Sequence, residues 1–190
     1  MMFCISNFMT TPLLQPHYIK PLRIHYRQNG VERTWEAVKS YDSVAVLLYH
    51  TQKEAFVLVK QFRAPVYMNY KEHTYTYELC AGIIDKQCSI KQIVKEEIDE
   101  ECGYAVPLER IEKITSFFTN VGVSGSKQHL FYAAIDDTMQ IHSGGGIESE
   151  EIIVEYLLLK DAKKFMYDES KAKTPGLLFA FEWFFRNLPL

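Results

Sequence analysis

The sequence lacks the features that mark secreted, membrane-spanning and nucleic-acid-binding proteins. Its four cysteines form no CxxC pair and, in 190 residues, are expected to be reduced thiols of a cytoplasmic protein. No apolar run approaches the roughly 18–20 residues of a membrane span, and the first residues lack the basic region of a signal peptide. Lys+Arg 21 against Asp+Glu 24 gives a net charge of −3. We therefore expect neither a nucleic-acid partner nor a membrane partner.

The composition that is present is typical of a globular domain, with 47% hydrophobic and 24% charged residues. Two strand-like runs, at 18–27 and 31–38, flank Gln28-Asn29-Gly30. Asn-Gly predicts a β-hairpin because both residues tolerate positive φ. We place a boundary near residue 40, which divides an N-terminal hairpin extension, residues 1–40, from a main domain, residues 41–190.

Strands are expected to dominate the main domain, with helices between them and at the end. Apolar or alternating runs predict strands at 43–49, 55–60, 73–80, 113–118, 128–135 and 152–159. A helix is predicted at 89–102, a short one is expected to be capped by Asp161, and Thr174-Pro175 is typical of the start of a last helix at 176–187. This order predicts a mixed α/β layered fold rather than a helical bundle.

The predicted helix at 89–102 ends in an unusual concentration of acids. Ser89 and Gln92 have the form of a capping box, and Gly103 is suited to the left-handed residue that ends a helix. Residues 96–101 contain five acids, including four like-charge pairs at helical spacing. These repulsions cost about 1–2 kcal/mol in total, and the helix dipole also disfavours anions at this end.

Two explanations of the acids stay open on this pattern alone. One is a solvated acidic helix face. The other is a divalent cation, which would turn the repulsion into attraction. Glu97 and Glu101 are four residues apart on one side of the helix, and Glu100 lies three from Glu97. Carboxylates at this spacing suit Mg²⁺ or Mn²⁺, with waters and substrate phosphates completing the coordination shell.

The stretch from residue 82 to 104 resembles the Nudix box, G-x5-E-x7-R-E-U-x-E-E-x-G-U, where U is a bulky apolar residue. Tyr104 stands in the last bulky position, while Cys88 replaces the first Glu and Glu96 replaces the Arg. The other positions match in register: Gly82, Glu97, Ile98, Glu100, Glu101 and Gly103. Segments 59–66, 77–82, 121–128 and 144–151 are similar to the nucleotide-sugar branch of the family, so the resemblance covers roughly residues 40–187.

The resemblance implies a Nudix-type α/β/α sandwich with a mixed sheet and an N-terminal antiparallel hairpin that dimerises. It implies Mg²⁺- or Mn²⁺-dependent hydrolysis of a nucleoside diphosphate sugar, such as UDP-glucose or ADP-ribose, to a nucleoside monophosphate and a sugar phosphate. By matching position, Glu97 and Glu101 would ligate the metal together with the Ala81 carbonyl, and Glu100 would be an additional or supporting ligand. The apolar last helix also favours a homodimer.

The two departures from the box bear on activity. Cys88 stands at a position that usually supports the loop. The Arg that Glu96 replaces usually neutralises and orients the glutamates, so we expect a looser empty site, with Lys91 or Lys95 as partial compensation. These departures motivate an alternative function: a catalytically weak or inactive Nudix-fold nucleotide-binding module.

The remaining candidate residues lie outside the box. In the resembled branch the catalytic base comes from a stretch like 144–151, which gives Glu148 as first choice and Glu150 as second, either as base or as a further metal contact. Three preceding glycines are expected to let that loop move. Arg63 is a candidate phosphate ligand, because guanidinium matches phosphate geometry, or else part of a surface salt bridge. Glu78 is a candidate substrate-site or metal carboxylate, or else a buried ion-pair partner.

Aromatic side chains and histidines are less informative. The candidates for stacking on a base or covering a sugar are Tyr67, Tyr70, Phe118 and Tyr132. With 12 Tyr and 12 Phe in the chain, core packing explains them at least as well. None of the six His pairs with Cys or carboxylates in a zinc pattern, so no histidine is assigned a role.

Overall fold

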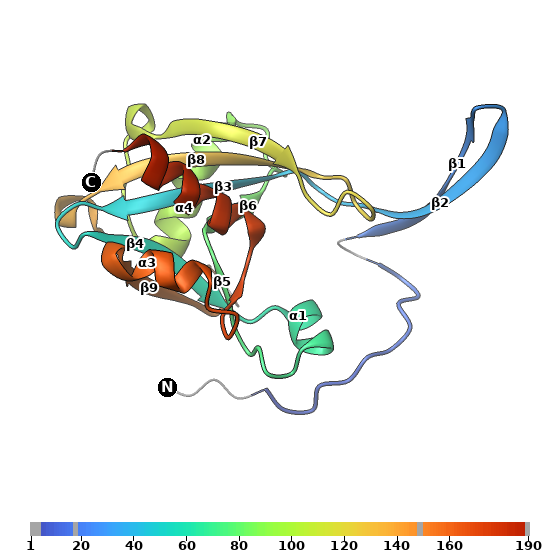
Figure 1. Cartoon of the computed structure of the whole chain (residues 1–190), viewed down its shortest axis with the longest axis horizontal. Helices are drawn as coiled ribbons and strands as arrows, with labels where there is room; N and C mark the ends of the chain where they lie inside the picture. Colours follow the sequence, from blue (N-terminus) through green and yellow to red (C-terminus); the bar gives the residue numbers. More distant parts are fainter. Residues whose placement is uncertain (1–4, 17–18, 148–149, 189–190) are drawn as a thin grey trace.

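The computed structural model of the chain describes residues 5–16, 19–147 and 150–188. Its main sheet has the strand order β10-β5-β4-β3-β8-β7, with β6 also paired to β3 and β9 to β4 (Figure 1). The strands of this sheet are β3 (Ser43–His50), β4 (Ala55–Gln61), β5 (Thr76–Glu78), β6 (Cys80–Ile83), β7 (Glu112–Phe118), β8 (Lys127–Ile135), β9 (Ile152–Leu158) and β10 (Ala172–Lys173).

The central strand β3 shows why helices cover both faces of this sheet. It pairs parallel with β8 and antiparallel with β4 and β6, so the sheet is mixed. Val44, Val46 and Leu48 belong to one hydrophobic core, whereas Ala45 and Leu47 belong to another. Because successive side chains of a strand point to opposite faces, each face of the sheet carries its own core.

The helices form the two outer layers. One core includes Ile93 and Val94 of α2, and the other includes residues of α3 and α4, which lie in front of the sheet in Figure 1. The predicted α/β/α sandwich is therefore confirmed. The helices are α1 (Ala64–Asn69), α2 (Ile90–Glu97), the π-helical turn η1 (Ile98–Cys102), the 3₁₀ turns η2 (Leu108–Arg110) and η3 (Asp137–Met139), α3 (Leu159–Met166) and α4 (Pro175–Asn187).

The N-terminal hairpin is a separate two-stranded sheet that extends away from the main sheet (Figure 1). It consists of β1 (Lys20–Gln28) and β2 (Val31–Lys39), joined at Asn29 and Gly30 with φ values of 51° and 79°. The predicted Asn-Gly turn is confirmed, although Tyr18, the expected start of the first strand, lies outside the described residues. The domain boundary near residue 40 stays a prediction.

Two local predictions were wrong. The expected strand at 73–80 is two short strands, β5 and β6, which pair with β4 and β3 respectively. Asp161 does not cap α3 but lies in its first turn, after Leu158. Among the described residues, no helix combines the length and apolar character that crossing a membrane requires.

Candidate active site

Helix α2 and the turn η1 carry the acids of the candidate site. Ser89 caps α2 by accepting a hydrogen bond on its Oγ from the Gln92 amide at 3.2 Å, as predicted. Ile93, Val94 and Ile98 face the core, so the acids occupy the other sides of the helix. The last turn is π-helical, a rare form that is frequent at functional sites. Gly103 ends it with φ of 77°.

Glu101 is buried against strand β6. Glu101 is only 5% exposed, and its Oε2 accepts a hydrogen bond from the Ala81 amide at 2.9 Å. Burial raises the pKa of Glu101 to about 8, while the hydrogen bond from Ala81 acts in the opposite direction. The protonated form of this carboxyl group is therefore favoured when no cation is beside it.

Glu97 lies one helical turn earlier and rests on the same strand. A Cβ atom on Gly82 would lie 1.9 Å from Glu97 Oε1, so only glycine leaves space for this carboxyl group. Burial raises the pKa of Glu97 to about 7, the charge of Glu100 adds to this, and Lys86 opposes it. The Gly82 of the box thus has a steric role in placing the first predicted metal ligand.

Positive charge reaches the acids from Lys86, not from the expected residues. Lys86 Nζ lies 2.9 Å from Glu96 Oε2. Within the described ranges neither Lys91 nor Lys95 forms an ion pair, and the Lys91 amine lies instead 3.5 Å from the Leu108 carbonyl. The prediction that Lys91 or Lys95 compensates was therefore wrong. Lys86 supplies the compensating positive charge instead, because it lies in the loop that folds back beside the helix.

The loop before β9 packs on the C-terminal end of the helix. The amides of Gly145 and Gly146 donate to the Glu101 and Glu100 carbonyls at 2.9 and 3.0 Å. Gly144 has φ of 68°, and a Cβ atom there would lie 2.3 Å from the Glu101 carbonyl oxygen. The three glycines were expected to permit motion. For Gly144 the structure gives another reason, which is close approach to the Glu101 carbonyl at the end of the helix.

The structure describes one of the two candidate bases, which lies at the far end of this loop. Glu148 falls outside the described residues. Glu150 is exposed, and its Oε2 accepts a hydrogen bond from the Ile147 amide at 3.1 Å. Burial is the largest cause of the raised pKa values of Glu97 and Glu101, and the charge of Glu150 is a smaller cause. Glu150 is therefore within electrostatic reach of both.

Arg63 and Glu78 form an ion pair beside these acids. Arg63 donates from Nε to Glu78 Oε1 at 2.8 Å and from Nη2 to Oε2 at 2.9 Å, and Thr76 Oγ1 donates to Glu78 at 2.5 Å. These hydrogen bonds raise the pKa of Arg63, and the charges of Glu101 and Glu150 add smaller contributions. Glu78 is 8% exposed, so it is the buried partner that one of the two sequence interpretations expected.

A histidine at this site was missed by the sequence reasoning. His142 Nδ1 accepts from the Gly144 amide at 3.0 Å, which leaves Nε2 to donate to Asp99 Oδ1 at 2.8 Å. His142 thereby ties the glycine loop to the acidic helix. No local pattern could have revealed it, because the two residues are 43 positions apart.

A cleft of about 830 Å³ begins at Arg63 and Glu78 and continues between α1 and the end of β7. Of the four candidate aromatics, Tyr70 and Phe118 line it and are 58% and 61% exposed. The other two pack against protein: Tyr132 is in the core beside α4, and Tyr67 lies edge-on to Phe62. The volume of the cleft is in the range of ligand sites.

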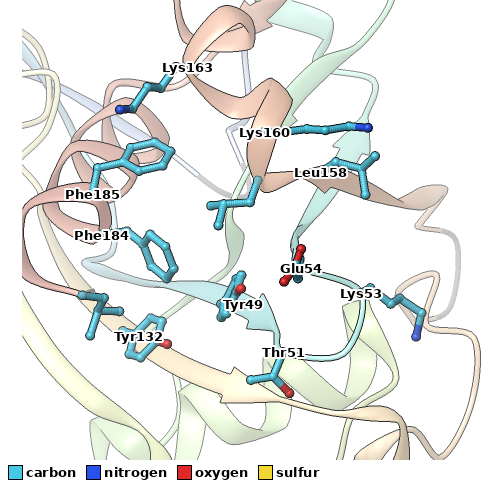
Figure 2. A pocket seen from close by; sticks show the side chains of 12 residues that line it. Tyr49, Thr51, Lys53, Glu54, Tyr132, Leu158, Lys160, Lys163, Phe184 and Phe185 are labelled. Carbon is cyan, nitrogen blue, oxygen red and sulfur yellow. The ribbon is translucent and has the colours of Figure 1, made fainter. Parts of the chain in front are cut away.

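A second cavity, of about 750 Å³, lies on the face of the sheet covered by α3 and α4. Figure 2 shows its aromatic side chains, including Tyr132 and Phe184, with Lys163 beside Phe185. Glu54 is the single acid among the described residues that line it. This cavity therefore lacks the paired carboxylates of the first site.

The donor set at the first site fits a hard divalent cation only through two carboxylates and main-chain atoms. Among the described residues, no three His, Cys, Asp or Glu side chains are grouped as ligands of one ion. Glu97 and Glu101 nevertheless converge on residues 81 and 82, and Mg²⁺ is usually held by one or two carboxylates with waters and substrate phosphates. Glu100 as a further ligand stays a prediction.

Comparisons with known proteins bear on the family of this chain. No protein-family model matches it. Uridine diphosphate glucose pyrophosphatase NUDT14 of Bos taurus is 36% identical, over 88% of this chain and 88% of the relative. The Mus musculus protein of that name is 32% identical, over 90% of each chain. GDP-mannose pyrophosphatase of Pectobacterium atrosepticum is 35% identical, over 75% of this chain and 73% of the relative.

These relatives span most of the chain, and its segment from residue 82 to 104 lies on a loop, a helix and a second loop beside a mixed sheet. The same segment holds the two buried glutamates described above. The chain belongs to the Nudix hydrolases.

Proposed function

We propose that this enzyme hydrolyses the diphosphate bond of a nucleoside diphosphate sugar and releases a nucleoside monophosphate and a sugar phosphate. The observation that carries the proposal is the crowding of Glu97 and Glu101 against β6. The charge of Glu101 also acts on Arg63, which lines a cleft large enough for such a substrate. The names of the relatives support the substrate class, since they are pyrophosphatases of UDP-glucose and GDP-mannose.

Catalysis would depend on Mg²⁺ or Mn²⁺, held by the Glu97 and Glu101 carboxylates and the Ala81 carbonyl, with Glu100 in support. When bound, such an ion neutralises charge on the phosphate oxygens and lowers the pKa of a bound water. The raised pKa values of Glu97 and Glu101, about 7 and about 8, favour this assignment because a nearby cation would relieve their repulsion.

Arg63 would bind a phosphate oxygen of the substrate. Glu78 engages its Nε and Nη2 atoms and holds the guanidinium in place, and among the described residues Nη1 has no partner and could bind an anion. Glu78 would thus act as the residue that orients Arg63. The proton of the attacking water would go to Glu148 or, failing that, to Glu150, whose charge contributes to the raised pKa values of Glu97 and Glu101.

The test is incubation of the pure protein with UDP-glucose, GDP-mannose and ADP-ribose, each with and without Mg²⁺. We expect a nucleoside monophosphate from at least one substrate, only when the metal is present. A protein that binds these compounds and yields no product would favour the alternative, a nucleotide-binding module without catalysis. Product formed equally well in excess chelator would contradict the metal dependence.

We also propose that the hairpin joins two copies of the chain. One face of the hairpin carries Leu22, Ile24 and Tyr26 of β1. The same face carries their cross-strand partners in β2, which are Ala37, Trp35 and Arg33. The other face carries ion pairs, Arg23 with Glu36 and Arg27 with Glu32. The apolar face is exposed, and an isolated two-stranded sheet is only marginally stable in water. A second hairpin would cover it.

A further inference from the structure

The loop between β7 and β8 forms one wall of the substrate cleft and has a fixed shape. Asn120 has φ of 45°, and its carbonyl accepts hydrogen bonds from the amides of residues 123–125 at 2.8–3.2 Å. Thr119 N donates to the Ser126 carbonyl at 2.8 Å. Residues 119–126 are therefore a turn closed by its own backbone hydrogen bonds.

Strand β2 of the hairpin holds this turn from outside. Trp35 Nε1 donates to the Gly122 carbonyl at 2.9 Å, and the Val38 amide donates to the Val123 carbonyl at the same distance. Trp35 is 53% exposed, so its ring is not part of a hydrophobic core. Its hydrogen bond to the turn spans 87 positions of sequence and connects the N-terminal extension to the cleft.

Two side chains line the cleft at the start of the turn: Phe118, the last residue of β7, and Asn120 within the turn. Lys127 Nζ lies over the Phe118 ring, 5.2 Å from its centroid, so a ligand would stack on the other face of the ring. Phe118 lines the cleft and is 61% exposed, which is a large exposure for an aromatic ring. Asn120 also lines the cleft, and its side-chain amide makes no hydrogen bond to any residue that the structure describes. A ring face and a free amide match a nucleobase, which has a flat face and an edge of donors and acceptors.

We propose that this turn contacts the base of the nucleotide and sets base preference, with Phe118 stacking on the ring and Asn120 bonding its edge. Trp35 is then a positioning residue that keeps the turn in place from the hairpin. The inference rests on the proposed function and names the segment that selects among nucleoside diphosphate sugars. Arg63 and Glu78, at the other end of the cleft, would leave the diphosphate next to Glu97 and Glu101.

The first test compares substrates that differ in base. Phe118→Ala should raise KM for both UDP-glucose and GDP-mannose at least about fivefold, with kcat changed less than about twofold, because stacking is insensitive to base identity. Asn120→Asp keeps a residue that tolerates positive φ but exchanges donors for acceptors. It should shift the ratio of kcat/KM between the two substrates at least about fivefold. Tyr167→Ala, at an exposed aromatic outside the cleft, is the control.

The second test addresses Trp35. Trp35→Phe keeps an aromatic ring and loses the N–H donor, so KM should rise while kcat stays near normal. Deuterium exchange should become faster in residues 119–126. His25→Lys, on the opposite face of the hairpin, which carries the ion pairs, should change neither.

Unchanged KM and unchanged base ratio in both cleft variants would overturn the inference, provided that the wild type is active. If the wild type turned over none of the substrates, the proposed function would fail instead. The inference would then be decided by calorimetric binding of UMP and GMP to the same variants. Equal affinities for wild type, Phe118→Ala and Asn120→Asp would contradict it.

Discussion

At the scale of single residues, the candidate site consists of acids placed where they repel one another. Gly82 gives Glu97 its position, Ala81 gives Glu101 a hydrogen bond, and Lys86 supplies a nearby positive charge. These arrangements only partly offset the burial of two carboxyl groups. Their tendency to remain protonated in the free protein is the property that the proposed cation would reverse.

Replacing either carboxylate should abolish most turnover. Glu97→Gln and Glu101→Gln preserve shape and remove the charge, so each should lower kcat about 10²-fold or more if the residue ligates the catalytic metal. Steady-state rates with saturating Mg²⁺ and a nucleotide sugar measure this. Glu109→Gln, an acid in the exposed 3₁₀ turn η2, is the control. Near-normal turnover in either test variant would remove that residue from the metal site.

The pH dependence of stability provides an independent measurement. The pKa values of Glu97 and Glu101 are raised to about 7 and about 8, so the folded chain holds more protons than the unfolded chain between about pH 4.5 and 8. Stability of the metal-free protein should therefore fall as pH rises through 7 and 8. Thermal unfolding at pH 6 and pH 9 in chelator should show a lower Tm at pH 9.

Added Mg²⁺ should restore most of that loss at pH 9 and have little effect at pH 6, because ligands must be deprotonated to bind a metal. Glu101→Gln should flatten the dependence of Tm on pH. A metal-free protein whose Tm is constant over this range would show that these carboxyl groups ionise normally.

The sequence could reveal which residues of the site lie close along the helix, but not their partners. Glu97, Glu100 and Glu101 are related by helical spacing, which a single sequence displays. The pairs Lys86–Glu96, Arg63–Glu78 and Asp99–His142 join residues 10, 15 and 43 positions apart. Such contacts depend on how loops and strands pack, and no periodic pattern encodes them.

At the scale of elements, the end of the acidic helix and the glycine loop form one unit. Helix carbonyls that have no partner within the helix accept hydrogen bonds from Gly145 and Gly146, and His142 joins the loop to Asp99. This packing fixes the segment that leads to the proposed base. Glycine is required where the loop backbone touches the helix backbone.

Substitution at Gly144 should test this packing. Gly144→Ala places a Cβ atom 2.3 Å from the Glu101 carbonyl oxygen at a φ of 68°, and should cost about 1–3 kcal/mol of unfolding free energy. Thermal unfolding should show a Tm lower by several degrees. Gly122→Ala is the matched control, since no atom lies within 4 Å of its Cβ position. Equal Tm values for the two variants would contradict the close approach.

Most strands and helices were predictable because their signals are local. The apolar runs of β3 and β4, the cap at Ser89 and the Gly103 stop each depend on neighbouring residues. The strand expected at 73–80 failed because β5 and β6 pair with different strands, a choice made by the whole sheet.

At the scale of the whole molecule, the hairpin has one apolar face and one face that carries ion pairs, which makes the proposed dimer testable. Ile24→Lys introduces a charge on the apolar face, whereas His25→Lys introduces one on the opposite face, which already carries ion pairs. Analytical ultracentrifugation should find a dimer for the wild type and for His25→Lys, and a monomer for Ile24→Lys. A wild type that sediments as a monomer at micromolar concentration would contradict the proposal.

In the proposed dimer, the bonds from β2 to the turn after β7 would make protein concentration a variable of the kinetics. A lone two-stranded ribbon frays in water, and fraying would release Trp35 and Val38 from the carbonyls that they hold. Affinity for the nucleotide should then weaken as the enzyme is diluted below its self-association constant, while the rate at saturation stays the same. Michaelis constants from nanomolar assays would consequently exceed those measured in concentrated solution.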